Sequence, residues 1–191
     1  GLKPRSWDML CDGDDTLLFA PASISNYIKA GFDRLFNDAG MSIKLENETS
    51  DLHGILFCQG KIVDCEDGLK FVQQPVRSYS RALVSTRLYM HPSAINKQLG
   101  QIGQCELAIN MGVPVLQEFA LAMLRCSGGA VAERPVVTGR TFKAQREWKA
   151  HGGIVTPLAI TDDARRTFEE AFGIEVWEQL WLEGVLRTAV F

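Results

Sequence analysis

Three carboxylates and one glycine are crowded between two short apolar runs near the start of the chain, in the segment Cys11–Asp15 (CDGDD). The flanking runs are Met9–Cys11 and Leu17–Phe19. Apolar runs separated by an Asp/Gly turn predict a β-hairpin. Carboxylates crowded at a hairpin tip repel one another unless a cation lies between them, and hard oxygen ligands suit Mg²⁺ or Mn²⁺. The segment therefore points to nucleotidyl transfer, in which two such ions about 3.5–4 Å apart stabilise the attacking and leaving oxygens.

The same segment also has an ordinary structural interpretation. A Gly-Asp-Asp triplet such as Gly13–Asp15 arises by chance in roughly a few per cent of chains of this length. Asp-Gly turns are common in hairpins that bind nothing. The strand-turn-strand context favours chemistry over this interpretation, and the segments that follow favour it further.

The composition is that of an ordinary globular protein, with 191 residues, of which 46% are hydrophobic and 23% charged. The length suits one domain or part of a larger one. No apolar run approaches the ~20 residues that span a bilayer. The five cysteines are odd in number and form no Cys-x-x-Cys pair, which predicts reduced thiols rather than a disulfide framework. The chain begins with Gly-Leu-Lys-Pro and enters an apolar strand almost at once, so we expect a fragment whose upstream part is missing.

Charge is unevenly distributed although the net charge is only −3. Residues 68–105 contain no Asp or Glu, and the balance before Asp67 is acidic. The cations of this middle segment are Lys70, Arg77, Arg81, Arg87 and Lys97. The asymmetry suggests an anionic partner for the middle segment and cations for the first part. A solvated face is an equally good explanation from charge alone.

The apolar periodicity predicts a β-rich first part. A helix is expected over 24–36, a short strand over Met41–Leu45, and a second hairpin formed by Ile55–Cys58 and Ile62–Val63 around a turn at 59–61. Ser23 or Ser25 is placed to cap the first helix. A further turn at 66–68 precedes a strand over Leu69–Val72.

Beyond Pro92 the pattern becomes helical. The expected helices are 93–110, 115–126, a basic helix over 141–151, one over 161–172 that Thr161 or Asp162 caps, and one over 176–186. We expect the second of these to be buried because it is almost entirely apolar. Trp177 and Trp181 of the last helix are expected in the core.

The order of these elements resembles the C-terminal part of an RNA-dependent RNA polymerase of positive-strand RNA viruses, and more narrowly the tombusvirus-like group. Cys11–Asp15 is similar to palm motif C, and Phe36–Glu46 (FNDAGMSIKLE) to motif D. Ile55–Val63 (ILFCQGKIV), followed by Val72–Leu83 (VQQPVRSYSRAL), resembles motif E and its junction with the thumb. The resemblance implies an α+β fold, in which residues 1–76 are the C-terminal palm and residues 77–191 the all-helical thumb.

The resemblance also implies roles for the matching residues at the catalytic centre. Asp14 would be the main motif C ligand of the Mg²⁺ or Mn²⁺ ions and Asp15 would assist it. Gly13 would permit the tight turn and a close approach of the primer end. Lys44 is placed as the motif D lysine that protonates the departing pyrophosphate, a role that needs a pKa near the working pH. A surface lysine on a strand is the simpler interpretation of Lys44.

The implied partners are an RNA template, a primer or product strand, nucleoside triphosphates and the remainder of the polymerase. Phe57, Cys58 and Gln59 would lie near the 3′ end of the primer strand and hold it. Contacts with RNA phosphates, which are sequence-independent and salt-sensitive, are expected from Arg77, Arg81 and Arg87. The family replicates RNA in the host cytoplasm at membrane-associated replication complexes, and we expect no membrane segment in this part of the chain.

The family's motifs A and B and its fingers precede motif C, and none is found in this sequence. The motif A carboxylate completes the metal site, the motif B residues select ribose, and cations of the fingers hold the triphosphate. We therefore expect these 191 residues to have no polymerase activity on their own.

Two other classes of function remain open at the level of sequence. Asp12–Thr16 also fits the Asp-x-Asp-x-Thr motif of haloacid dehalogenase-like phosphatases, with Asp12 as nucleophile and Asp14 as acid/base on Mg²⁺. That family needs a doubly wound parallel sheet and further residues, for which the candidates are Thr86, Lys97 or Lys143, and Asp162 with Asp163. The second alternative is a non-enzymatic RNA-binding module with an incidental acidic turn.

Overall fold

The first hairpin forms where the apolar runs predict it. In the computed structural model, which describes residues 7–84, 91–129 and 155–190, strands β1 (Asp8–Asp12) and β2 (Asp15–Phe19) pair antiparallel. Asp12 lies opposite Asp15, so only two residues, Gly13 and Asp14, connect the strands. Gly13 has φ +66°. A positive φ at the first position of a two-residue turn suits the twist of a hairpin and favours glycine there.

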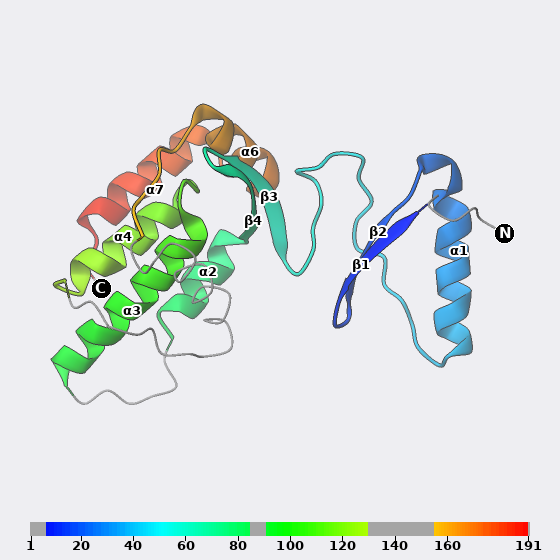
Figure 1. The fold of residues 1–191 in the computed structure, drawn as a ribbon, viewed down its shortest axis with the longest axis horizontal. Coiled ribbons are helices and arrows are strands. Elements are labelled where there is room, and N and C mark those ends of the chain that lie inside the picture. Colours follow the sequence, from blue (N-terminus) through cyan, green and yellow to red (C-terminus); the bar gives the residue numbers. More distant parts are fainter. Residues whose placement is uncertain (1–6, 85–90, 130–154, 191) are drawn as a thin grey trace. The chain divides into compact units, whose positions relative to one another are not determined.

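The described residues fall into two compact units, 1–59 and 60–191. Each unit contains one antiparallel hairpin together with one or more helices, which is the α+β class expected from the sequence (Figure 1). The expected division at residue 76 concerns the domains of a complete polymerase and stays a prediction. The basic helix expected over 141–151, and with it Lys143, lies outside the described residues, as do Thr86 and Arg87.

Helix α1 (Ala22–Asp38) follows the hairpin directly. Its N-cap is Pro21, and no side chain caps it. The prediction that Ser23 or Ser25 caps the helix is therefore wrong, because both serines lie inside its first turns. Pro21 sets an extended entry to the helix without offering a side-chain acceptor. Gly40 follows the C-cap with φ +74°, which ends the helix as expected.

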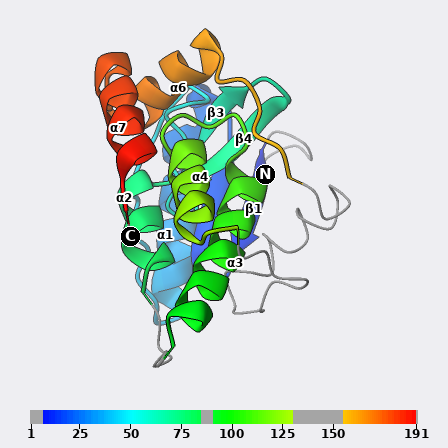
Figure 2. The same ribbon diagram turned by 90° about the vertical axis from the view of Figure 1, so that its left-hand side faces the viewer.

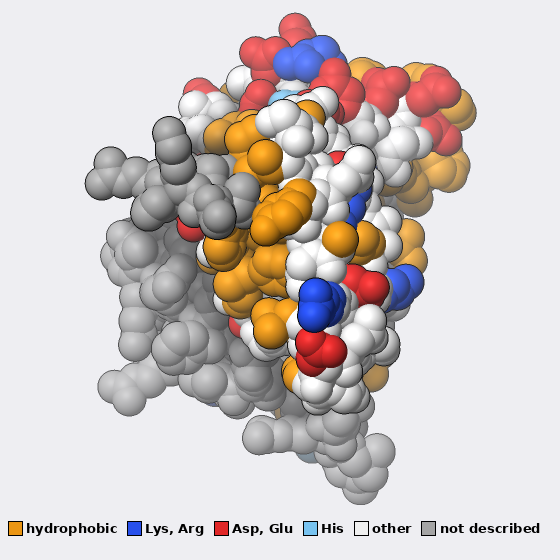
Figure 3. Space-filling view, turned by 90° about the vertical axis from the view of Figure 1, so that its right-hand side faces the viewer, with side chains coloured by type: hydrophobic (Ala, Val, Ile, Leu, Met, Phe, Trp, Pro, Cys, Tyr) orange, Lys and Arg blue, Asp and Glu red, His pale blue; other side chains and the backbone are white. Residues whose placement is uncertain are grey.

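Apolar residues of α1 are only partly covered within the first unit. Phe32 packs edge-on against Trp7 and stacks on Phe36, with 6.3 Å between the ring centroids in each pair. In contrast, Tyr27 and Leu35 are 66% and 64% exposed. Figure 3 shows apolar side chains gathered on the face of the molecule that carries α1. Within the described residues of the first unit, much apolar surface is therefore exposed.

Residues 41–49 adopt no regular structure, so the prediction of a strand over Met41–Leu45 is wrong. An alternating pattern needs a neighbouring strand to satisfy its backbone groups. Within the described part of the first unit, β1 and β2 pair only with each other, so this segment has no such partner.

A second hairpin is present, but its two strands lie further along the chain than the predicted pair 55–58 and 62–63. Strand β3 (Gly60–Cys65) pairs antiparallel with β4 (Gly68–Gln73), and the turn lies at 66–67. The prediction that Ile55–Cys58 forms the first strand is wrong. Cys58 and Gln59 have positive φ values of 46° and 59°, which end any extended run there. A short apolar run such as 55–58 has no periodicity that distinguishes a strand from an irregular segment.

Gly60, the first residue of β3, lies so close to β4 that a side chain here would force the Phe71 ring to move. A Cβ atom at this position would lie 2.5 Å from Cε1 of the Phe71 ring on the opposite strand. It would also lie 3.0 Å from the carbonyl oxygen of Val72. The glycine that looked like the middle of a turn in the sequence is instead the site of close packing between two strands.

Beyond β4 the described residues of the second unit are helical or irregular. The helices are α2 (Pro75–Ala82), α3 (Pro92–Asn110), α4 (Leu116–Cys126), α6 (Asp162–Phe172) and α7 (Val176–Thr188). Figure 2 shows α4 flanked by α3 and α7, in agreement with the contacts that it makes with both. The predicted helix boundaries at 93–110, 115–126 and 161–172 are confirmed to within one residue, and α7 extends two residues beyond its predicted end.

The core of the second unit lies between the hairpin and the helices. Val63 and Val72 of the hairpin pack with Leu116 of α4 and Phe168 of α6, and all four are at most 1% exposed. Smaller clusters join α3 to α4, as their buried apolar side chains predict. Helix α4 is therefore the central buried helix, which confirms the prediction.

The face of helix α7 that packs against the core is not the face that the sequence predicts. Trp177 and Trp181 are each 63% exposed, so the prediction that they are core residues is wrong. The buried residues of α7 are Gln179 and Glu183, both 0% exposed. A polar face can be buried when every charge finds a partner, and Glu183 does so through Arg165.

Of the helices in the described ranges 7–84, 91–129 and 155–190, none has the length and hydropathy that crossing a membrane requires.

Candidate active site

The hairpin tip presents three exposed carboxylates, those of Asp12, Asp14 and Asp15. Because Asp12 and Asp15 are directly opposite in an antiparallel pair, their side chains leave the same face of the hairpin. Like charges placed in this way repel each other. No ion pair among the described residues neutralises any of the three. The tip therefore concentrates negative charge where solvent can reach it. A metal cation or a cationic partner would bind to such a group of carboxylates.

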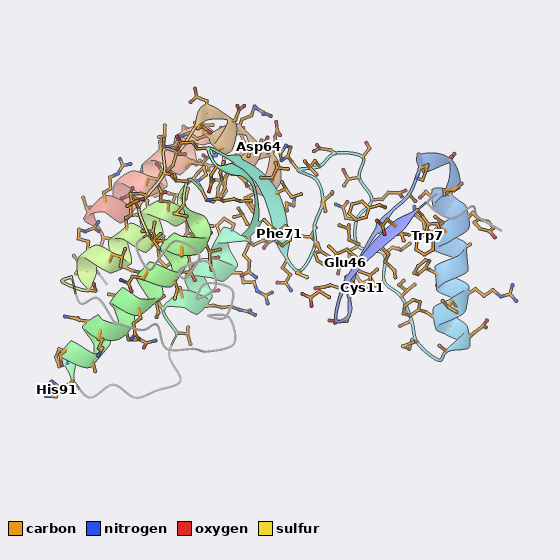
Figure 4. All side chains as sticks on the ribbon, in the orientation of Figure 1. Trp7, Cys11, Glu46, Asp64, Phe71 and His91 are labelled. Carbon is orange, nitrogen blue, oxygen red and sulfur yellow. The ribbon has the colours of Figure 1, made fainter. Side chains whose placement is uncertain are left out.

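Cys58 contacts this tip from a segment 46 residues further along the chain. Its thiol donates to Oδ2 of Asp12 across 3.6 Å. Loss of solvent and the neighbouring carboxylates of Asp12 and Asp15 raise the pKa of the thiol to about 11. The cysteine is thus held as a neutral donor beside two carboxylates. Figure 4 shows the neighbouring Cys11, which precedes Asp12 on β1.

The other two members of the predicted Phe-Cys-Gln group differ in exposure. Phe57 is half-buried, whereas Gln59 is exposed. The backbone of Cys58 and Gln59 lies in the left-handed region, which places the side chains of these two residues in directions that an extended strand would not allow.

Lys44 lies on the irregular segment after α1 and is 84% exposed. Its ammonium group pairs with Glu46 at 3.2 Å (Figure 4 labels Glu46). The described contacts do not bring Lys44 to the carboxylates of the tip. Its role as a proton donor stays a prediction.

Cations predicted to contact RNA belong to the second unit. Arg77 and Arg81 stand one turn apart on α2, so they share one face of that helix. Among the described residues, the buried Nε atom of Arg77 has no hydrogen-bond partner. Lys70 makes contacts within the unit instead. Its ammonium group pairs with Asp67 at 2.9 Å and donates a hydrogen bond of 2.5 Å to the carbonyl of Met111. Its charge is therefore used inside the unit.

A complete metal site is not present within the described residues. No group of three or more His, Cys, Asp or Glu side chains there is arranged to hold a metal ion. Asp14 and Asp15 offer the oxygen atoms that Mg²⁺ or Mn²⁺ prefers, but Mg²⁺ needs near-octahedral coordination. The tip does not fit an ion by itself, and a bound ion would take further ligands from elsewhere.

The features that a phosphatase of the haloacid dehalogenase type would need are not found among the described residues. Both sheets are antiparallel hairpins, and no parallel sheet is formed in residues 7–84, 91–129 and 155–190. Asp162 and Asp163 open helix α6, which Thr161 caps by accepting a hydrogen bond of 3.1 Å from the amide of Ala164. These two carboxylates serve the helix N-terminus, where negative charge is favourable.

Sequence reasoning missed two contacts near the hairpin. The first is the hydrogen bond between Cys58 and Asp12. The second joins Lys29 and Ser25 of α1 to Glu48, and these two partners hold the pKa of the Glu48 carboxyl below its ordinary value. Neither contact has a signal in the sequence, because each joins residues more than 18 positions apart.

The chain is similar to one class of known protein over almost its whole length. The model of a family described as "Viral RNA dependent RNA polymerase" matches residues 1–190. The RNA-directed RNA polymerase of Carnation mottle virus is 26% identical over 191 residues, covering 98% of this chain and 24% of that protein. The RNA-directed RNA polymerase of Turnip crinkle virus is 28% identical over 185 residues, covering 95% of this chain and 24% of that protein.

The RNA-directed RNA polymerase of Carnation ringspot virus is 27% identical over 176 residues, which are 91% of this chain and 22% of that protein. The chain thus spans about a quarter of the length of these relatives. No solved structure matches it. Because the family model covers the chain almost from end to end, and the exposed carboxylate hairpin lies inside that match, this chain belongs to the viral RNA-dependent RNA polymerase family.

Proposed function

We propose that this chain is the part of a viral RNA-dependent RNA polymerase that carries the catalytic carboxylate hairpin. The supporting observation is the hairpin tip, where Gly13 and Asp14 form a two-residue turn and no described cation neutralises the exposed carboxylates of Asp14 and Asp15, in a chain of this family. In the complete enzyme, residues 1–76 would be the C-terminal palm and residues 77–191 the thumb. Replication complexes on host membranes would be its place of action.

The reaction would be the attack of an RNA 3′-hydroxyl on a nucleoside triphosphate, in the two-metal class of nucleotidyl transfer. Asp14 and Asp15 would contribute part of the ligand set. The remaining ligands would come from the rest of the polymerase, in agreement with the incomplete site within these residues. Gly13 supports this role because its positive φ allows the turn to be tight. Lys44 would donate a proton to pyrophosphate if the segment 41–49 comes to the tip in the complete enzyme.

RNA would be held by segments on either side of the unit boundary. Phe57, Cys58 and Gln59 would lie at the primer end, and Arg77, Arg81 and Arg87 would bind phosphates. The positions of Arg77 and Arg81, one turn apart on one face of α2, support their assignment, because two cations on one helix face can bind neighbouring phosphates.

The decisive experiment uses RNA synthesis by the full natural chain that contains these residues. Asp14→Ala is expected to lower the rate by about a hundredfold or more, because metal ligands contribute at least as much as their supporting neighbours. The matched control is Asp33→Asn, an exposed carboxylate on α1 in the same unit, which should leave the rate unchanged. Full activity of Asp14→Ala would contradict the proposal.

Two further measurements separate the alternatives. Asp12→Asn should abolish phosphate release by a phosphatase that uses Asp12 as nucleophile, but should only reduce RNA synthesis by a polymerase. We also propose that the 191 residues are inactive alone. Incorporation of labelled nucleotide by the purified 191-residue chain would contradict that statement.

A further inference from the structure

The thiol of Cys58 is directed at the acidic tip rather than into a hydrophobic core. It donates to Oδ2 of Asp12 across 3.6 Å, and its surroundings include the carboxylate of Asp15 on the opposite strand. Cys58 is only partly buried, so it does not serve chiefly to fill space. A thiol is protonated at neutral pH and can donate one hydrogen bond, which makes it a suitable neutral partner for a carboxylate.

The backbone around Cys58 is held in an unfavourable conformation. Cys58 and Gln59 are consecutive residues other than glycine with φ values of 46° and 59°. Such conformations persist only where the surrounding structure determines them, and they gather at functional sites. In this turn they present the thiol to a hairpin that precedes it by 46 residues.

The carboxylates that receive the thiol need such support. Asp12 and Asp15 are directly opposite each other, and no described cation offsets their repulsion. An antiparallel hairpin of two strands is marginally stable alone. A donor that binds Asp12 reduces the repulsion across the pair and fixes where that side chain lies. Asp15 and its neighbour Asp14 at the turn are then held in one arrangement.

We propose that Cys58 is a positioning residue, which fixes the Asp12–Asp15 pair and thereby the carboxylates of the catalytic tip. This inference rests on the proposed polymerase function for its effect on rate, but not for its effect on the hairpin. It assigns the thiol of Cys58 to the hairpin, and it leaves Phe57 and Gln59 as the members of the 57–59 group that would contact the primer strand.

The test uses the full natural chain that contains these residues, with Cys58→Ala and Cys58→Ser. Supporting partners of a metal ligand set contribute about 10- to 100-fold, and a thiol is a weak donor, so Cys58→Ala should lower kcat about tenfold without raising the KM for RNA. Cys58→Ser keeps a donor and should lie within about threefold of the unchanged enzyme. Cys126→Ala, a thiol of the second unit, is the matched control and should change neither quantity.

A second readout follows the hairpin itself. Amide hydrogen exchange of residues 8–19 should become at least several-fold faster in Cys58→Ala, stay slow in Cys58→Ser, and not change in α4 or α6. Asp12→Ala removes an exposed side chain and so does not threaten the fold. Its effect on exchange should not add to that of Cys58→Ala in the double variant, because both remove the same contact.

Each outcome decides for or against the inference. Unchanged kcat and unchanged exchange in Cys58→Ala would overturn it, as would fully additive effects in the double variant. A raised KM for RNA with unchanged exchange would overturn it in favour of a primer contact. An active Asp14→Ala variant would contradict the polymerase function, while hydrogen exchange would still decide whether Cys58 positions the hairpin.

Discussion

The amide of Val115 donates a hydrogen bond of 3.0 Å to the carboxylate of Glu183, which lies 68 residues further along the chain. Val115 has φ +63°, a conformation that a β-branched residue rarely adopts. In the same turn, the amide of Leu116 donates a hydrogen bond of 2.6 Å to the carbonyl of Pro114. The fully buried Glu183 therefore holds a strained turn that begins α4 against helix α7.

The same carboxylate also neutralises Arg165 of α6. Two hydrogen bonds, of 3.1 Å from Nη1 and 3.0 Å from Nη2, join the guanidinium to both oxygens of Glu183. This paired geometry is strong and directional. One residue of α7 thus fixes the positions of α4 and α6, at the centre of the second unit.

Removal of Glu183 should therefore destabilise the second unit strongly. Glu183→Ala leaves Arg165, which is 14% exposed, without its partner, and we expect a loss of about 3–5 kcal/mol in the free energy of unfolding. The matched control is Glu170→Ala on α6, which breaks the exposed pair with Arg166 and should cost less than about 1 kcal/mol. Urea unfolding measures both, and equal losses would contradict the role given to Glu183.

Thr161 provides a smaller and more local test. Its hydroxyl accepts the amide of Ala164 at 3.1 Å and caps α6. Thr161→Ala should cost about 1 kcal/mol of unfolding free energy. Thr161→Ser keeps the oxygen and should cost only a fraction of that. If serine and alanine at this position gave the same stability, the cap would contribute nothing.

The exposed tryptophans of α7 should contribute little to stability. Trp177→Ala and Trp181→Ala remove side chains that are 63% exposed, and each should change the unfolding free energy by less than about 1 kcal/mol. Phe168→Ala removes a side chain that is 0% exposed and should cost about 3–5 kcal/mol. A large loss in either tryptophan variant would restore the expectation that these residues lie in the core.

The free energy of unfolding should fall at alkaline pH because two cysteines, Cys65 and Cys105, are buried. Burial raises the pKa of Cys65 and of Cys105 from the ordinary value of 9.0 to about 11. The folded state therefore binds more protons than the unfolded state between these values, and the stabilisation is complete below pH 9 and is lost as the pH rises toward 11.

Unfolding free energies at pH 8 and pH 10.5 would measure this loss, with ~1–2 kcal/mol expected from each thiol. Other groups also titrate in this window, so the comparison needs a variant without the two thiols. The double variant Cys65→Ala/Cys105→Ala should lose less stability over the same interval than the unchanged chain. Identical losses would show that these thiols do not ionise differently in the folded state.

Much of the local structure could be predicted because its cause is local. The Asp/Gly turn between apolar runs specifies the first hairpin, and Thr161 followed by Asp162 and Asp163 specifies the start of α6. The predictions that were wrong concern residues whose state depends on a distant partner. The run 55–58 looked like a strand until its turn was known, and Trp177 looked like a core residue until the buried face of α7 was known.

For the candidate site, the sequence by itself determined that Asp12, Asp14 and Asp15 gather at the tip of a hairpin, because turn and strand preferences act over a few residues. The pairing of Asp12 with Asp15 in the structure then showed that only two residues connect the strands. Only the tertiary structure decided that Cys58 donates to Asp12, that Lys70 is used within the second unit, and that Glu183 lies at its centre. These contacts join residues 41 to 68 positions apart. No pattern of short period encodes them, because they arise from how separate elements pack and from the need to satisfy each buried polar group.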